Sequence, residues 1–188
     1  MDHPKSKQKK RDLWPVKAFI LTFSLGMVFN FFSETSMSGA TLPVALLALF
    51  AIIAVGILFD IVGVAVACGE VTAYTAMASR RIPGAKQSIR LIQSADMVSN
   101  ICNDVVGDIC GIVSGAMGAA ITVRIVMANP GWNGLFTGII VSSAIAAVTV
   151  GGKALGKKAA MRNSHKIVFF VGRLAAILSR ERPKKGKI

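Results

Sequence analysis

The hydrophobic residues of this chain fall into long runs that are separated by shorter polar links. A helix needs about 20 mostly apolar residues to cross the hydrocarbon core of a bilayer. Four runs meet or approach that length, and they cover residues 16–32, 44–68, 101–127 and 135–152. The pattern therefore predicts an all-α polytopic membrane protein with four transmembrane helices.

The links between these runs differ in length and character. Residues 33–43 and 128–134 are short connections, whereas residues 71–99 form a longer amphipathic stretch that is divided at Pro83-Gly84. Proline followed by glycine is a strong break in a helix. We therefore expect two short helices in this link, lying at the membrane surface.

The last segment, residues 153–188, is basic and holds another amphipathic stretch. From Ser164 to Arg180 most apolar side chains fall on one side of a helix and basic side chains on the other. A helix of this kind is either an anchor in the membrane interface or a docking element for a partner. Of these two interpretations, the sequence favours the anchor.

Positive charge is distributed unevenly over the links. The chain has a net charge of +13 and 22 lysines and arginines, although only 16% of its residues are charged and 53% are hydrophobic. With four crossings, all basic residues except Arg124 lie on one side of the membrane. Six of them are near the N-terminus, most in the arm of residues 1–15; four are in the 71–99 link, and eleven follow residue 152. Short cytoplasmic loops collect Lys and Arg. We therefore expect a protein of the cell (inner) membrane with both termini in the cytoplasm, against an anionic inner leaflet.

The composition and motifs argue against several functional classes. No basic–aromatic interleaving accompanies the charge, so nucleic-acid binding is not expected. The sequence has no P-loop, dinucleotide fingerprint or nucleophile–base pair, and we expect no enzyme. Cys68, Cys102 and Cys110 lack metal-binding spacing, and their odd number does not indicate a disulfide framework. We interpret them as reduced, apolar residues.

The N-terminal region has an alternative interpretation. A basic arm, an apolar run and then Ser38-Gly39-Ala40 resemble a secretory signal peptide with its cleavage site. Polar residues at 33–37 place that site far from the apolar run. We therefore expect the run at 16–32 to remain as a transmembrane anchor.

Acidic residues inside two of the runs are the candidates for function. A carboxylate at the bilayer centre costs about 2.5–3.5 kcal/mol on insertion scales, and it is rarely found there without a partner or a task. Asp104 and Asp108 are four residues apart and share a helical face with Asn100 and Asn103. Asp60 lies at a similar depth on the preceding run. We expect these oxygen-bearing side chains to converge.

The third run divides into two faces at about 100° per residue. The small and oxygen-bearing face, which includes glycines at every fourth position, is expected to point toward the other helices. The opposite face is apolar and is expected to point toward lipid; it consists of Ile101, Cys102, Val105, Val106, Ile109, Ile112, Val113 and Ala116.

Oxygen ligands without histidine or cysteine are typical of sites for hard cations such as Mg²⁺. The acids and amides of the second and third runs form such a set. The alternative is a structural pairing of an acid with a basic residue, for which Lys153, at the inner end of the fourth run, is the candidate partner. The habit of intramembrane acids to be functional favours the cation site.

Three short motifs add a resemblance to a known family. Residues 67–72 (ACGEVT), 81–86 (RIPGAK) and 98–104 (VSNICND) follow one another in an order and spacing that resemble the transmembrane domain of the CorB/CorC and cyclin M (CNNM) magnesium and cobalt transporters. Residues 103–112 (NDVVGDICGI) are similar to a run in short bacterial CorB-like proteins. The resemblance covers residues 44–152 and the final helix.

The resemblance implies a homodimer with Mg²⁺ held among Ser, Asn and Glu oxygens in a cavity open to the cytoplasm. The positions that match motif residues are Glu70, Ser99, Asn100 and Asn103. It also implies a short form that lacks the cytoplasmic nucleotide-sensing (CBS) domains of larger members.

These observations lead to one leading hypothesis and one alternative. The chain is expected to be a divalent cation (Mg²⁺/Co²⁺) transporter or transporter-like membrane protein with an acidic and amide cation site. The alternative is a non-transporting membrane module that recruits a partner or anionic lipid. The expected metal ligands are Asp60, Glu70, Ser99, Asn100, Asn103, Asp104 and Asp108.

Overall fold

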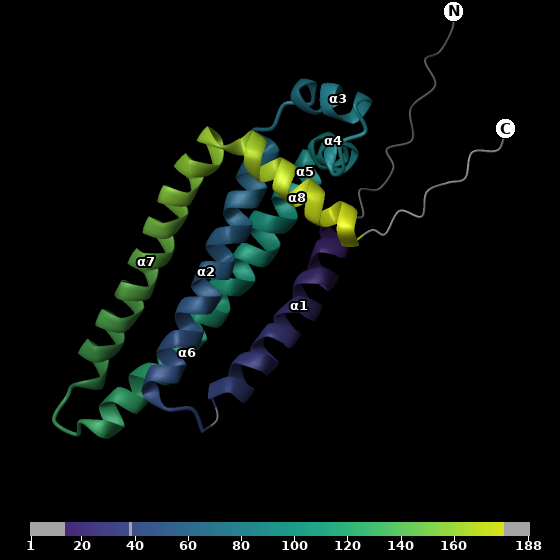
Figure 1. The fold of residues 1–188 in the computed structure, drawn as a ribbon. Coiled ribbons are helices and arrows are strands. Elements are labelled where there is room, and N and C mark those ends of the chain that lie inside the picture. Colours follow the sequence, from purple (N-terminus) through teal and green to yellow (C-terminus); the bar gives the residue numbers. More distant parts are fainter. Residues whose placement is uncertain (1–13, 38, 179–188) are drawn as a thin grey trace, which may run out of the picture.

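The structure is a computed structural model and describes residues 14–37 and 39–178. Within these residues all regular elements are helices (Figure 1). Their bounds are α1 Trp14–Met37, α2 Leu42–Ala67, α3 Thr72–Ser79, α4 Ala85–Gln93, α5 Ala95–Asn100, the π-helix η1 Ile101–Val106, α6 Gly107–Ala128, α7 Gly134–Arg162 and α8 Ser164–Leu178.

In the described part of the chain, four helical segments are long and apolar enough to cross a membrane. They are α1, α2, the unbroken run α5–η1–α6 and α7. The segment in α1 is the shortest, at 18 residues, and the other three have 26, 34 and 29 residues. The predicted all-α fold with four membrane-spanning helices is confirmed.

The third and fourth spanning helices extend well past one end of their apolar runs. The third begins at Ala95 rather than Ile101, and the fourth continues past Gly152 to Arg162. The added residues of the fourth include lysines, which are good helix formers and which extend their charged ends toward water. Hydrophobicity therefore marks the part of a helix that suits lipid, and not the whole helix.

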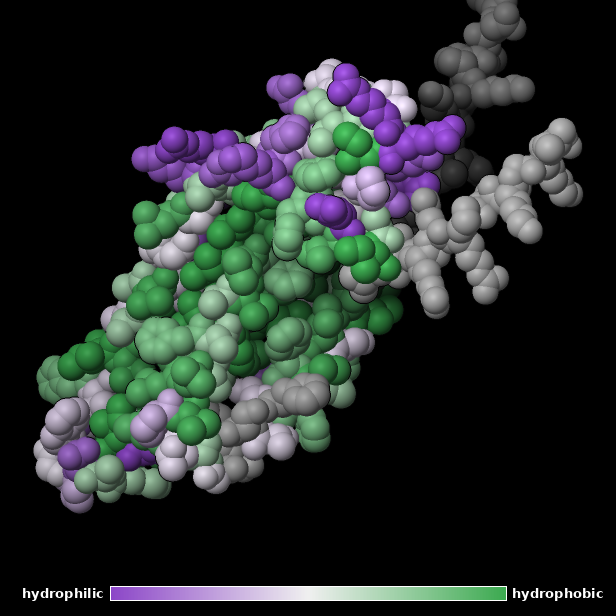
Figure 2. Space-filling view, in the orientation of Figure 1, coloured by the Kyte–Doolittle hydropathy of each residue, from purple (hydrophilic) through white to green (hydrophobic). Residues whose placement is uncertain are grey.

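The chain reverses direction at two opposite ends of the bundle (Figure 1). One end holds the α1–α2 and α6–α7 connections, and there Arg124 donates a hydrogen bond to the backbone carbonyl of Ala40. The other end holds α3, α4, α8 and the last turns of α7. We call it the basic end because it collects Arg80, Arg81, Lys86, Arg90, Lys157, Lys158, Arg162, Lys166 and Arg173. Hydrophilic side chains gather there, and hydrophobic ones cover the long helices (Figure 2).

The main core lies between α2 and the α5–η1–α6 run. Its buried side chains are Ala45, Leu49, Ile53, Val105, Ile109, Val113, Met117 and Ile121. Most of the apolar face expected to meet lipid is thus buried, whereas Asp104, Asp108, Gly111 and Gly115 are exposed. The predicted orientation of this face was wrong, because a helix in a membrane packs on its neighbours without being more apolar on the packed side.

The helices at the basic end form a platform of their own. The predicted break at Pro83-Gly84 is confirmed, since Gly84 has a φ of +94° directly before α4. The buried Ser88 of α4 lies against Gly172 of α8, where a Cβ would lie 2.9 Å from the Gly84 carbonyl oxygen. The predicted helix from Ser164 is present up to Leu178. Residues 1–13 and 179–188, with their share of the basic residues, lie outside the described residues.

Candidate cation site

Close glycine contacts set the register between α2 and the helix that faces it. A Cβ on Gly56 would lie 2.9 Å from the Cβ of Cys110, and one on Gly63 would overlap the side-chain amide of Asn103. The level midway between these contacts is Asp60 on α2 and residues 106–107 on the facing helix. Asp60 is only 8% exposed. We call the surface where α2 meets α5, η1 and the first turns of α6 the α2–η1 seam, and Asp60 is its buried carboxyl group.

Asn103 supplies a second oxygen to this seam. Its side-chain Nδ2 donates a hydrogen bond to Ser99 Oγ at 3.2 Å, which fixes the orientation of the amide. Its Oδ1 is buried, points at Gly63 and has no hydrogen-bond partner among the residues that the structure describes. A buried acceptor without a donor costs about 1–3 kcal/mol. An oxygen in this state is available to a ligand that brings positive charge.

The seam contains the π-helix, and Asn103 lies inside it. In a π-helix the backbone bonds run from residue i to i+5, and such turns occur frequently at functional sites. The wider turn of Ile101–Val106 also shifts every later side chain relative to an α-helical wheel. This is a second reason why the faces expected from 100° per residue did not match the structure.

Lys153 lies on α7 at about the same level of the bundle as the α2–η1 seam. Gly152 lies against Ile57 and Gly156 against Ile61, so Lys153 is near the level of Asp60. Its Nζ lies 3.3 Å from the position that a Cβ on Gly107 would take. The lysine that the sequence suggested as a structural partner for an acid is therefore close to the candidate site.

The structure gathers some of the expected ligands and separates others. Ser99 and Asn103 are hydrogen-bonded to each other at the α2–η1 seam. Asp60 is buried within one turn of Gly63, which lies against Asn103. The side chains of Asn100, Asp104 and Asp108 are exposed. In the part of the chain that the structure describes, no three or more His, Cys, Asp and Glu side chains group so as to hold a metal ion. The oxygen pair at the seam would thus need water to complete the coordination of Mg²⁺, which normally retains several waters.

Glu70 lies apart from this seam, at the corner between α2, α3 and the start of α8. It is exposed and lines a cavity of about 220 Å³ together with Tyr74 and His165. The Tyr74 hydroxyl donates a hydrogen bond to the backbone oxygen of His165 at 2.8 Å, and the two rings stack. Burial raises the pKa of the Tyr74 hydroxyl, so this contact is neutral and structural.

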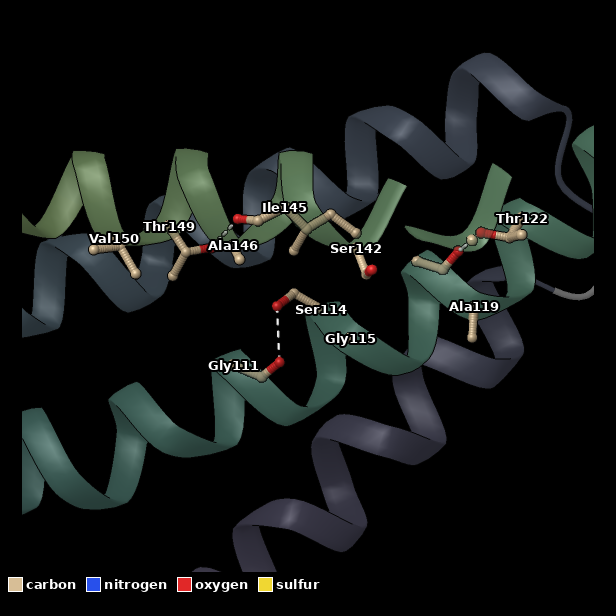
Figure 3. A pocket seen from close by; sticks show the side chains of 12 residues that line it. Gly111, Ser114, Gly115, Ala119, Thr122, Ser142, Ile145, Ala146, Thr149 and Val150 are labelled. Atoms are coloured by element: carbon tan, nitrogen blue, oxygen red, sulfur yellow. Dashed lines mark hydrogen bonds between the residues drawn. The ribbon is translucent and has the colours of Figure 1, made fainter. Parts of the chain in front are cut away.

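A second surface that carries hydroxyl groups, which the sequence indicated only in part, lies between α6 and α7. Figure 3 shows this α6–α7 groove, a cavity of about 530 Å³ lined by small residues and hydroxyl groups. Gly111, Ser114 and Gly115 of α6 belonged to the expected small face, but the hydroxyls of Ser142 and Thr149 on α7 were not considered. Ser142 and Thr149 could be indicated only by knowing which face of α7 packs beside α6, and the pattern of a single helix does not contain that information.

The hydroxyl groups of the α6–α7 groove are satisfied within their own helices. Each donates to a backbone oxygen three or four residues earlier: Ser114 to Gly111 at 2.9 Å, Thr122 to Gly118 at 2.9 Å, Ser142 to Ile139 at 3.2 Å and Thr149 to Ile145 at 2.8 Å. Three of these donors and their acceptors are visible in Figure 3. The hydroxyl groups of the groove therefore need no ligand to satisfy them, in contrast to the acceptor oxygen of Asn103 at the α2–η1 seam.

Comparisons with known proteins add no relative to this description. No family model, no curated protein and no solved structure matches the chain significantly.

Proposed function

We propose that this membrane protein binds a divalent cation, Mg²⁺ or Co²⁺, as a substrate at the α2–η1 seam. The proposal includes transport of that cation and a likeness to the transmembrane domain of the CorB/CorC/CNNM family. One observation carries it: the buried Oδ1 of Asn103 has no hydrogen-bond partner and lies against α2 within one turn of the buried Asp60. Carboxylate and amide oxygens are hard ligands of the kind that Mg²⁺ prefers.

The level of the seam relative to a membrane supports access from one side. On each of three helices we compare the level of the seam with the opposite end of the bundle. Asp60 follows the first residue of α2 by 18 positions, Arg124 follows Gly107 by 17, and Lys153 follows Leu135 by 18. At 1.5 Å per residue these distances are about 26–27 Å, close to the thickness of the hydrocarbon core, which is about 30 Å. The seam would then lie at the membrane boundary next to the basic end. By the positive-inside rule this side is the cytoplasm, so we propose that both termini lie there and that the site opens to the cytoplasm.

A binding experiment tests the site directly. After chelation, addition of Mg²⁺ is expected to raise the unfolding temperature of the purified protein. At a Mg²⁺ concentration about 100 times the dissociation constant, the free energy of unfolding should increase by about 2.7 kcal/mol. Asp60→Asn should abolish the increase. Asp104→Asn removes the same charge from an exposed position and should preserve it. An unchanged Mg²⁺ response in Asp60→Asn would refute the proposed site.

Substitution of Lys153 separates the cation site from a structural pairing with Asp60. If a divalent cation binds at the seam, Lys153→Met removes a competing charge and should tighten Mg²⁺ binding. If Lys153 pairs with Asp60, the same substitution leaves a buried carboxylate without a partner and should cost about 3–5 kcal/mol of stability, with no response to Mg²⁺. Thermal unfolding at several Mg²⁺ concentrations distinguishes the two results.

Flux through liposomes then tests transport as opposed to binding. We expect Mg²⁺ and Co²⁺ entry into vesicles that contain the protein and no entry with Asp60→Asn. Binding without flux would favour the alternative, a non-transporting module that recruits a partner or anionic lipid at its basic end.

The homodimer that the resemblance implies also remains a proposal, and the outward face of α6 supports it. Asp104, Asp108, Gly111 and Gly115 are exposed along one side of a spanning helix, where the small residues would let a second copy approach closely. Gly111→Leu with Gly115→Leu should reduce the dimer fraction measured by light scattering. Gly151→Leu is the matched control, since a Cβ at any of these three glycines meets nothing within 4 Å. Equal effects in both variants would argue against this interface.

A further inference from the structure

A cavity at the basic end has features that the cation site does not use. It measures about 650 Å³ and lies between the α3–α4 turn and the last turns of α8. Arg81 and Lys86 contribute basic side chains to its lining and Ile177 contributes an apolar one, and none of the described residues that line it is acidic. A cavity with two cations and no counter-charge attracts an anion.

The start of α4 adds backbone donors to this cavity. Lys86 and Gln87 belong to the first turn of the helix, where backbone N–H groups have no partner within the helix. No side chain caps this end, and its first turn contains no acidic residue. The helix dipole also favours negative charge at this position. The amides and the two cationic side chains together form a complementary surface for a phosphate group.

Arg173 of α8 brings a third positive charge close to the cavity. A Cβ on Gly84 would lie 2.9 Å from the Cα of Arg173 and 3.2 Å from its Cβ, so the α3–α4 turn rests on α8 at this residue. The side chain of Arg173 is exposed. The position of the cavity is therefore fixed relative to α8 by close backbone contact.

An apolar stripe on α8 leads away from the cavity. Phe170, Leu174 and Ile177 are 63%, 43% and 71% exposed, and they follow one another at helical spacing on the side opposite the buried Val168 and Gly172. Such a stripe on a helix at the end of a transmembrane bundle is suited to lipid chains. Since Ile177 also lines the cavity, the anion site and the apolar stripe are continuous.

We propose that this cavity binds the phosphate headgroup of an anionic phospholipid, whose acyl chains lie along Phe170, Leu174 and Ile177. Arg81, Lys86 and the first amides of α4 hold the phosphate. The apolar stripe distinguishes a lipid from free phosphate, which would have no use for it. The site is independent of the cation site at the α2–η1 seam.

Lipid retention by the purified protein tests this proposal. The protein is released from vesicles of phosphatidylglycerol and phosphatidylcholine into mild detergent, and the lipid that remains bound is counted by native mass spectrometry. We expect wild type to retain phosphatidylglycerol over phosphatidylcholine, and Arg81→Gln with Lys86→Gln to lower retention by about thirtyfold, since each of the two basic groups contributes about 1 kcal/mol. Arg81→Lys with Lys86→Arg keeps both charges and should retain the lipid.

A matched control separates a built site from general surface charge. Lys157→Gln with Lys158→Gln removes the same charge from exposed positions of α7 and should change retention less than about twofold. An equal loss in both double variants would overturn the proposal, as would displacement of the lipid by millimolar inorganic phosphate, which would identify a phosphate site. Unchanged thermal unfolding confirms that the variants fold.

Discussion

The α6–α7 groove and the α2–η1 seam satisfy their polar atoms in opposite ways. In the α6–α7 groove, the hydroxyls of Ser114, Thr122, Ser142 and Thr149 all donate to carbonyls of their own helix. At the α2–η1 seam, Asp60 is buried and the Oδ1 of Asn103 has no donor. Hydroxyl groups carry a donor and can satisfy themselves, whereas an ionised carboxylate and an amide oxygen only accept.

This difference indicates where a ligand is needed. A helix can place hydroxyls in a membrane at low cost, because the preceding turn supplies an acceptor. It cannot do so for acceptors, because its own N–H groups are already used. Polar residues alone therefore do not mark a site in a bilayer, and the unsatisfied acceptors do. Substitutions on both surfaces test this distinction.

The largest effect is expected at Gly63. Alanine there would overlap the amide of Asn103, with the new Cβ 2.8 Å from its Cγ. Relieving the overlap moves Asn103 away from Ser99, and we expect Gly63→Ala to destabilise the protein by about 2 kcal/mol, as overpacking of a tight site does. It should also weaken Mg²⁺ binding. The measurements are thermal unfolding and its Mg²⁺ dependence.

Gly111→Ala provides the comparison for Gly63→Ala. A Cβ on Gly111 meets no atom within 4 Å, so the monomer should keep both its stability and its Mg²⁺ response. If Gly63→Ala were as mild as Gly111→Ala, the close approach of α2 and η1 would not be needed for the seam.

An intermediate effect is expected in the α6–α7 groove at Gly118. A Cβ there would overlap Cδ1 of Ile145, which is the flexible end of a side chain. We expect Gly118→Ala to cost about 1 kcal/mol and to leave Mg²⁺ binding intact. Gly138→Ala is the control, because its Cβ would make an ordinary contact of 3.7 Å with Thr122 Cγ2. A lost Mg²⁺ response in Gly118→Ala would show that the two surfaces are coupled.

The smallest effect is expected at Ser114. Its hydroxyl is buried but bonded only to the Gly111 carbonyl of the preceding turn, which keeps its backbone bond when the hydroxyl is removed. We expect Ser114→Ala to change the free energy of unfolding by less than about 1 kcal/mol. A larger loss in chemical or thermal unfolding would mean that the groove depends on its hydroxyls, and the contrast with the seam would fail.

The sequence predicted the elements better than their orientation. Apolar runs predicted four spans. The break before α4 was also predictable, because it depends only on the local sequence Pro83-Gly84. The faces of the third span were assigned wrongly, since lipid and protein interior are equally apolar and the π-helix shifts the wheel. Asp60 and Asn103 were among the expected ligands, but the level at which their helices face each other depends on contacts such as Gly63 against Asn103 that no single run encodes.

The platform at the basic end has a consequence for the order in which the protein assembles. Tyr74 bonds to a residue 91 positions later and Ser88 to one 80 positions later. At a synthesis rate of about 5–20 residues per second, α3 and α4 wait several seconds for α8. All four spans can therefore enter the membrane before the platform at the basic end closes. The ribosome must synthesise the chain through α8 before the α3–α4 turn finds its partner, so a product truncated before α8 would keep the spans but not the completed platform.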